Sequence, residues 1–380
     1  MYSMQKVINE FWEDYKKNYQ VSWQEQKIIE DIKSCKTDSM GGNTSQCEEC
    51  GHTEIHYNSC RNRHCPCCQA IEKEIWTDKK MESTIEAPYF HLVFTVPEQL
   101  RMMIYQNQKL LYDLMYAKVK ETLTELAKDP KYLGAQIGFF CVLHTWSDDL
   151  IFHPHIHAVV MAGGLTKQNQ WRQSSQKFFI PVKVLAKVFR GKFLHQLKKY
   201  YYQNRLNLYG ENQELAEAAS FEKVLTSCYD TNWYTYSKET FSGQQELIRY
   251  LSRYTHRIAI SNQRITSIDK QTVTISTKNK NGGKKEVTMA GVEFIRRFLM
   301  HALPKGFVRI RNYGLLANRN KKTKLALCRK LTGSKQHQAM FENLSKTQIL
   351  SIILGYDVTI CSECKKGRMY KTYLPSTKAS

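Results

Sequence analysis

The sequence predicts an α+β fold built on an antiparallel sheet, and two observations support this class. Strand-like segments at 89–96, 137–146 and 155–163 are mixed with helical segments in an irregular order, unlike the regular alternation of parallel βαβ proteins. The second and third strands are separated only by the polar turn "SDDLIFHP", and so short a connection joins antiparallel neighbours.

The first 84 residues predict a helical segment followed by a cysteine-rich module. Apolar residues recur at roughly helical spacing over 5–34, with a break near 19–21, which indicates one or two helices. Cysteines then cluster over 35–68, and a further helix is expected at 71–84. We therefore expect a helical segment at 1–34 and a separate module at 35–84.

The remaining residues predict one large α+β domain over 85–320 and a basic C-terminal region over 321–380. Pro97 ends the first strand, and 98–128 is expected to form one long amphipathic helix. The later pattern predicts helices at 181–204, 243–259 and 292–303, a strand at 232–238, an exposed hairpin with a basic tip over 264–290, and a basic, partly strand-like segment at 306–324. The lysine-rich tail after Cys364 is expected to be flexible.

The charge of the chain indicates a polyanionic partner. Lys and Arg number 56 against 35 Asp and Glu, which gives a formal net charge of +21 and an isoelectric point of about 9.4. Among soluble proteins so basic a balance usually means nucleic acid, and a solvated basic surface is the alternative. No run approaches the ~18 apolar residues of a membrane span. The first residues lack the apolar centre of a signal peptide, so we expect a cytoplasmic protein with no membrane partner.

The cysteine-rich module has the spacing of a zinc site. In a reducing compartment clustered cysteines are more often metal ligands than disulfides. Two Cys-x-x-Cys pairs, 47/50 and 65/68, are separated by fourteen residues, close to the spacing of a tetrahedral zinc ribbon. Cys35, Cys60 and His64 could hold a second zinc, or Cys60 and His64 could replace one pair in the first site. The full set of candidate zinc ligands is Cys35, Cys47, Cys50, Cys60, His64, Cys65, Cys67 and Cys68.

The role expected for this zinc is structural. A closed site with four ligands leaves no position for substrate, so one or two zinc ions would support folding. Arg61 and Arg63 would then place positive charge on a module suited to DNA contact. The "HTE" and "PCCQA" segments resemble a zinc deaminase motif, but position 70 is Ala where that motif needs Cys. Cys361 and Cys364 form another pair, which must borrow ligands or stay without metal.

The segment "FHPHIHAVVMAGG" predicts half of a second metal site. On a strand, His155 and His157 point to the same side, and two neutral imidazoles on a rigid strand suit a divalent ion. His144, across the expected hairpin, is the natural third ligand. As a bare pattern His-x-His is more often structural than catalytic.

A possible nucleophile lies in the predicted helix at 243–259. Tyr250 and Tyr254 are four residues apart and therefore lie on one helical face. From periodicity alone such tyrosines usually pack in a core. Three arginines with the same spacing would present guanidinium groups to phosphates on an adjoining face; they are Arg249, Arg253 and Arg257.

Four ordered motifs together resemble the bacterial IS91-family transposases, which belong to the HUH endonuclease superfamily. The motifs are "YNSCRNRHCPCCQ", "HTWSDDLIFHPHIHAVVMAGGL", "YLSRYTHRIAISN" and "FIRRFLMHALPKGFVRIRNYGLLAN", and the similarity spans about 35–364. The resemblance implies an antiparallel HUH nuclease domain preceded by a helical, zinc-binding DNA-recognition module. It also implies rolling-circle-type transposition, in which single-stranded DNA at the element's ends is cleaved and rejoined.

The resemblance also implies roles for the site residues. His155 and His157 would bind Mg²⁺ or Mn²⁺ at the scissile phosphate, and Tyr250 and Tyr254 would form 5′-phosphotyrosine links in turn. Further phosphate contacts are expected from Arg296, Arg297, Arg309 and Arg311. No phosphate-binding loop is present in the sequence, so unwinding would need a host helicase. The alternatives are a non-catalytic, zinc-dependent DNA-binding regulator, or an HUH replication initiator or relaxase.

Overall fold

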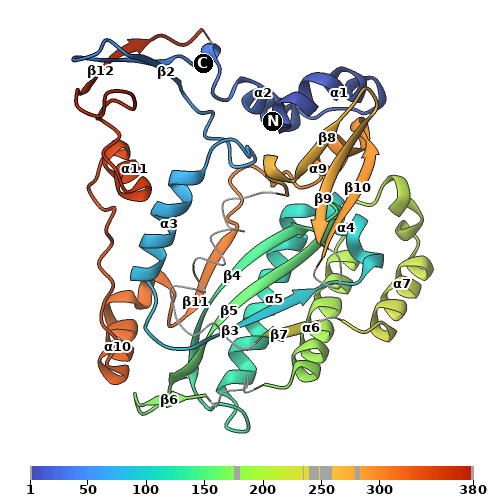
Figure 1. Ribbon diagram of the computed structural model, residues 1–380. Coiled ribbons are helices and arrows are strands. Elements are labelled where there is room, and N and C mark those ends of the chain that lie inside the picture. Colours follow the sequence, from blue (N-terminus) through green and yellow to red (C-terminus); the bar gives the residue numbers. More distant parts are fainter. Residues whose placement is uncertain are drawn as a thin grey trace.

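The computed structural model describes residues 2–174, 180–233, 235–238, 248, 259–278 and 283–377, and a six-stranded sheet forms its centre (Figure 1). Five strands run in the order β11-β4-β5-β3-β7, and β6 pairs with the end of β5. Every pair is antiparallel, which confirms the α+β prediction. The strands are β3 (Tyr89–Thr95), β4 (Gln136–Trp146), β5 (Phe152–Leu165), β6 (Trp171–Gln173), β7 (Thr235–Lys238) and β11 (Ile310–Gly314).

The two faces of this sheet pack differently. Helices α5 (Gln108–Lys128) and α6 (Val182–Tyr202) lie along one face (Figure 1), where Ile156 and Val160 of β5 join the main core. Val159 and Met161 of β5 belong instead to a smaller core. Because side chains alternate along a strand, His155 and His157 share the face of that smaller core.

The N-terminal residues form the two expected helices, α1 (Met4–Asn18) and α2 (Trp23–Ser34). The Ser3 side chain caps α1, and Ser22 with Glu25 forms a capping box at the start of α2. Helix α1 packs against α9 (Gly291–Leu299), where a Cβ on Gly291 would lie 2.3 Å from the Phe11 ring. The glycine therefore permits this close helix contact.

The predicted helix at 98–128 is interrupted at Asn107. The chain forms α4 (Arg101–Gln106) and then α5, with φ −121° and ψ 37° at Asn107 between them. The Asn107 side chain donates to the Asn207 carbonyl at 2.9 Å and accepts from the Asn207 N–H at 2.7 Å. A contact one hundred residues away thus breaks a helix that local periodicity predicts to be continuous.

Two smaller sheets flank the core. The hairpin predicted over 264–290 is confirmed as β9 (Thr272–Lys278) and β10 (Lys284–Ala290), with β8 (Ile265–Ile268) as a third strand; its tip, 279–282, lies outside the described residues. The other sheet has the order β12-β1-β2 and comprises β1 (Gly42–Cys47), β2 (Thr53–Tyr57) and β12 (Met369–Leu374).

The expectation of a flexible tail after Cys364 is wrong over 369–374. Strand β12 pairs with β1 in antiparallel register from Gly42 opposite Leu374 to Cys47 opposite Met369. The pairing joins segments more than three hundred residues apart, so local composition gave no sign of it. In Figure 1 the N-terminal and C-terminal regions accordingly meet at this sheet.

The other described α-helices are α3 (Ala70–Glu82), α7 (Ala218–Asp230), α10 (Ala326–Thr332) and α11 (Lys346–Leu354). The predicted helix at 243–259 lies outside the described residues except for positions 248 and 259. Among the helices in the described part of the chain, none has both the length and the apolar character needed to cross a membrane.

Candidate functional site

Three histidines converge on the central strands, as the sequence predicted. His144 on β4 lies directly opposite His155 on β5, and His157 follows two residues later on the same face. One ring nitrogen from each lies within 4.8 Å of the others. Ring centroids are 4.1 Å apart for His144 and His157 and 4.9 Å apart for His155 and His157. One ion can therefore contact all three imidazoles.

Hydrogen bonds orient two of these rings. The Nδ1 atom of His155 lies 2.7 Å from the His153 carbonyl oxygen, which only accepts, so Nδ1 carries the proton and Nε2 keeps its lone pair. The Nδ1 atom of His157 lies 2.7 Å from Nε2 of His91 on β3. When His157 donates in this bond, its Nε2 is also left as a ligand.

His91 was missed by the sequence reasoning. It lies on the same face of β3, and its ring stacks on His157 with 4.9 Å between centroids and 7° between planes. The available signal was a single histidine inside the otherwise apolar segment "YFHLVFTV". Its position behind His157 is that of a residue that orients a metal ligand.

The environment keeps the three histidines neutral. Burial lowers the pKa of His144 and His157 well below the ordinary imidazole value, and it lowers the pKa of His155 to about 4. Neutral imidazoles are the form that binds metal. The donor set therefore fits a divalent ion, and nitrogen ligands of this type suit Mn²⁺ better than the harder Mg²⁺.

The proposed nucleophiles and their helix lie outside the described residues. This applies to Tyr250 and Tyr254 and to the three neighbouring arginines, Arg249, Arg253 and Arg257. Their roles stay predictions.

The four later arginines have distinct environments. Arg296 and Arg297 both pair with Glu293, at 2.6 and 2.7 Å. Arg309 is buried, its Nε donates to the Leu143 carbonyl at 2.9 Å, and its guanidinium lies over the Trp146 ring. Arg311 pairs with Asp113 at 2.5 Å. Arg296 and Arg297 are thus half-buried and ion-paired, whereas Arg309 lies inside, near the histidines.

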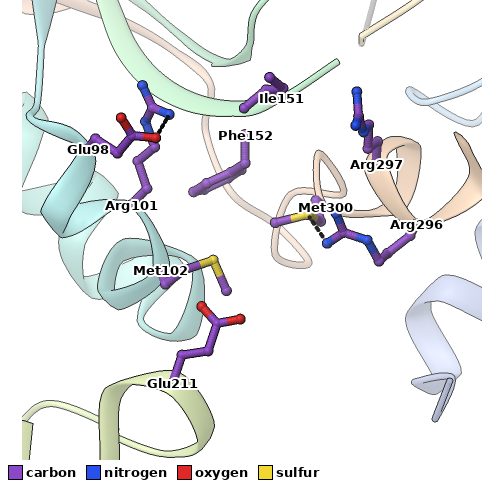
Figure 2. A pocket seen from close by; sticks show the side chains of 9 residues that line it. All are labelled: Glu98, Arg101, Met102, Ile151, Phe152, Glu211, Arg296, Arg297 and Met300. Atoms are coloured by element: carbon purple, nitrogen blue, oxygen red, sulfur yellow. Dashed lines mark hydrogen bonds and ion pairs between the residues drawn. The ribbon is translucent and has the colours of Figure 1, made fainter. Parts of the chain in front are cut away.

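A pocket of about 320 Å³ lies at the start of β5, the strand that carries His155 and His157 (Figure 2). Arg296, Arg297 and Arg101 contribute to its wall, together with Phe152 at the start of β5. An NH2 group of Arg101 donates to Nδ1 of His153 at 3.2 Å. The wall of the pocket is therefore linked directly to the strand that carries two of the histidines.

The cysteines form two separate clusters of four. One consists of Cys35, Cys60, Cys65 and Cys68, and the other of Cys47, Cys50, Cys361 and Cys364. Sulfur atoms are 3.9 Å apart between Cys60 and Cys68 and 3.7 Å apart between Cys47 and Cys364. Four thiolates about 2.3 Å from one zinc ion in a tetrahedron are about 3.8 Å apart, so both clusters fit zinc.

This arrangement corrects the pairing that the sequence spacing suggested. The pairs 47/50 and 65/68 do not share a site, because each finds its partners elsewhere. The pair 361/364 does borrow ligands, and the β12–β1 pairing brings it to Cys47 and Cys50. Backbone N–H groups of Gly367 and Lys366 lower the pKa of Cys364 to about 6, which favours the thiolate that binds metal.

Cys67 is not among the ligands of either cluster, and neither is His64. Its Nδ1 lies 3.0 Å from the Asn62 side-chain oxygen, and its Nε2 accepts from the Leu303 N–H at 3.2 Å. With both ring nitrogens used in this way, the buried imidazole joins the module to the loop after α9. Arg61 and Arg63 are exposed, and Arg63 donates to the Phe307 carbonyl at 3.0 Å.

Comparisons with known proteins agree with these features. Residues 138–324 match a family described as "Putative transposase", and residues 7–96 match the "Transposase zinc-binding domain". The chain is 38% identical over 372 residues to "Putative transposase y4qJ" of Sinorhizobium fredii (strain NBRC 101917 / NGR234), covering 96% of this chain and 93% of that one. It is 26% identical over 303 residues to the "Transposase for insertion sequence element IS801" of Pseudomonas savastanoi pv. phaseolicola, covering 78% and 71%.

Among solved structures, the conjugative relaxase TrwC in complex with oriT DNA aligns with a TM-score of 0.25 and 13% identity, over 44% of this chain and 71% of the relaxase. So weak a likeness supports no conclusion about this chain. The sequence matches are sufficient without it: the chain belongs to the IS91 family of transposases. The zinc-binding domain and the two cysteine clusters indicate that it binds zinc.

Proposed function

We propose that this transposase cleaves and rejoins single-stranded DNA at the ends of its mobile element, by tyrosine attack that a divalent ion assists. The main support is the convergence of His144, His155 and His157 on one sheet face, with neutral rings and, in His155, an Nε2 atom that keeps its lone pair. A bound Mn²⁺ or Mg²⁺ would act there as a Lewis acid that polarises the scissile phosphate.

The proposed chemistry uses Tyr250 and Tyr254 in turn. A tyrosine oxygen attacks phosphorus, the bond from phosphorus to the 3′ oxygen breaks, and the products are a 5′-phosphotyrosine and a free 3′ hydroxyl. The tyrosine proton is released and the 3′ oxygen takes up a proton. Attack by another 3′ hydroxyl reverses the step and rejoins DNA, so no external energy source is required.

The basic character of the chain supports DNA as its partner. The net charge of +21 suits a polyanion, and Arg296 and Arg297 line the pocket at the start of β5. Buried Arg309 adds positive charge behind the same site, where its presence lowers the pKa of His144 further. Unwinding by a host helicase and association with the nucleoid belong to the same proposal.

A denaturing-gel assay tests this function. Protein is incubated with Mn²⁺ or Mg²⁺ and a labelled single strand carrying the element's own end, beside the same sequence as a duplex. We expect a covalent protein–DNA band with the single strand that is lost in His157→Ala and in the double variant Tyr250→Phe, Tyr254→Phe. Tyr356→Phe, which changes an exposed tyrosine on the distant C-terminal segment, serves as the control. DNA binding without any covalent band would favour a non-catalytic regulator.

A further inference from the structure

We infer that the pocket at the start of β5 binds one unstacked nucleobase of the DNA strand and prefers a base with an exocyclic amino group. The inference rests on the proposed function, since it takes single-stranded DNA as the substrate. It adds a subsite that reads the identity of a base close to the metal cluster.

The position of the pocket fits a nucleotide near the scissile phosphate. Phe152 lines the pocket at the start of β5, three residues before His155, with its side chain in the main core and the histidines on the face of the smaller core. Arg101 lines the pocket and donates to His153, whose ring centroid is 5.2 Å from that of His155. A strand whose phosphate lies at the histidines would therefore pass this pocket with a neighbouring nucleotide.

The size and the apolar lining suit a base. A volume of about 320 Å³ is at the lower end of the range of small-molecule sites, which fits a single nucleotide. Phe152, Met102 and Met300 supply apolar surface around the open space (Figure 2). An aromatic ring and thioethers are suitable packing partners for the face of an unpaired base.

The polar groups of the pocket are three arginines and two carboxylates. One carboxylate, Glu98, accepts from Arg101 at 2.9 Å. Arg296 and Arg297 are fixed by their shared ion pair with Glu293, and Arg297 also donates to the Asp149 carbonyl at 3.1 Å. Within the described part of the chain, by contrast, no hydrogen bond or ion pair engages the exposed carboxylate of Glu211, which also lines the pocket (Figure 2).

A carboxylate in a DNA-binding pocket indicates which part of the nucleotide it meets. It repels a phosphate but accepts hydrogen bonds from base N–H groups, as acidic side chains do from the cytosine amino group. The arginines can meanwhile donate to base acceptors or to the neighbouring phosphate. Adenine, cytosine and guanine carry an exocyclic amino group and thymine does not, so the pocket is expected to discriminate against thymine.

The test measures non-covalent binding by fluorescence anisotropy without added Mn²⁺ or Mg²⁺. The probes are an oligo(dT) strand of about twelve nucleotides, a length typical of single-strand sites, and the same strand with one central dA, dC or dG. At least one substituted strand should bind about fivefold or more tightly than oligo(dT). Glu211→Ala should remove this difference.

Two further variants make the outcome decisive. Glu214→Ala removes an exposed carboxylate from the same short helix, Gly210–Ala216, outside the pocket lining, and should leave the discrimination intact. Met102→Trp should remove the discrimination by filling the pocket. The inference is wrong if all four strands bind equally and Glu211→Ala strengthens binding to each strand by as much as Glu214→Ala does. In that case the Glu211 carboxylate only repels phosphate.

A mononucleotide arm separates DNA from a free nucleotide. If dAMP, dCMP or dGMP binds as tightly as the matching strand and depends equally on Glu211, the assignment to a DNA strand is overturned. The assay needs no tyrosine and no catalytic metal, so its failure is distinguishable from failure of the proposed cleavage. A covalent band without base discrimination contradicts only the pocket, and discrimination without a covalent band contradicts only the cleavage.

Discussion

Replacing His91 with alanine is expected to weaken Mn²⁺ binding to the histidine site by about 10- to 100-fold, the usual effect of losing a partner that orients a ligand. His91 Nε2 lies 2.7 Å from Nδ1 of His157, and the two rings are nearly parallel. Without that contact the His157 ring can rotate or carry its proton on the nitrogen that should bind the ion. The predicted loss corresponds to about 1.4 to 2.7 kcal/mol of binding free energy.

Electron paramagnetic resonance of free Mn²⁺ measures this affinity without requiring activity. His153→Ala is the matched control, because His155 is oriented by the backbone carbonyl of residue 153, which the substitution keeps. His91→Gln should recover part of the affinity, since its side-chain oxygen can accept from His157. If His91→Ala binds Mn²⁺ as tightly as the unchanged protein, or if His153→Ala is equally impaired, the orienting role is refuted.

Three further predictions concern metals and stability. Cys60→Ser and Cys364→Ser should each remove one of two zinc ions, as measured by elemental analysis. Only Cys364→Ser should also expose the segment that carries β12 to proteolysis. Equal cleavage of the two variants would contradict the two-site arrangement. Titrated against the metal-free histidine site, Mn²⁺ should bind more tightly than Mg²⁺, and the reverse order would argue for an unseen carboxylate ligand. Burial lowers the pKa of His301 from 6.5 to about 4, so the free energy that its neutral ring contributes to folding is complete above pH 6.5 and is lost as the pH falls toward 4. In denaturant unfolding, the free energy of unfolding of the unchanged protein should therefore fall over this pH range by about 3 kcal/mol more than that of His301→Gln. Parallel pH profiles of the two proteins would refute this prediction.

Much of the histidine site was predictable because strand geometry is local. A two-residue repeat places His155 and His157 together, and a short turn places β4 beside β5, so His144 was the natural third ligand. His91 was not predicted, because it lies on β3 and its register with β5 depends on the whole sheet.

The pairing of the zinc ligands, in contrast, could not be predicted from local sequence. Spacing identified the cysteines as ligands, yet it suggested a wrong partnership for the two Cys-x-x-Cys pairs. The true partners of Cys47 and Cys50 are more than three hundred residues away, and the β12–β1 pairing that delivers them leaves little local signal. Likewise, Asn107 breaks a regular helical pattern through a side-chain contact with residue 207.

The most direct test of the central claim is to identify the residue that becomes linked to DNA. Trypsin cleaves after Arg249, Arg253 and Arg257, so Tyr250 and Tyr254 fall in separate peptides, "YLSR" and "YTHR". After reaction with Mn²⁺ and an element-end strand, nuclease trimming and mass spectrometry should find nucleotide-linked phosphotyrosine in one or both of these peptides. A link on any other residue, or DNA cleavage with no linked peptide at all, would contradict the proposed tyrosine mechanism.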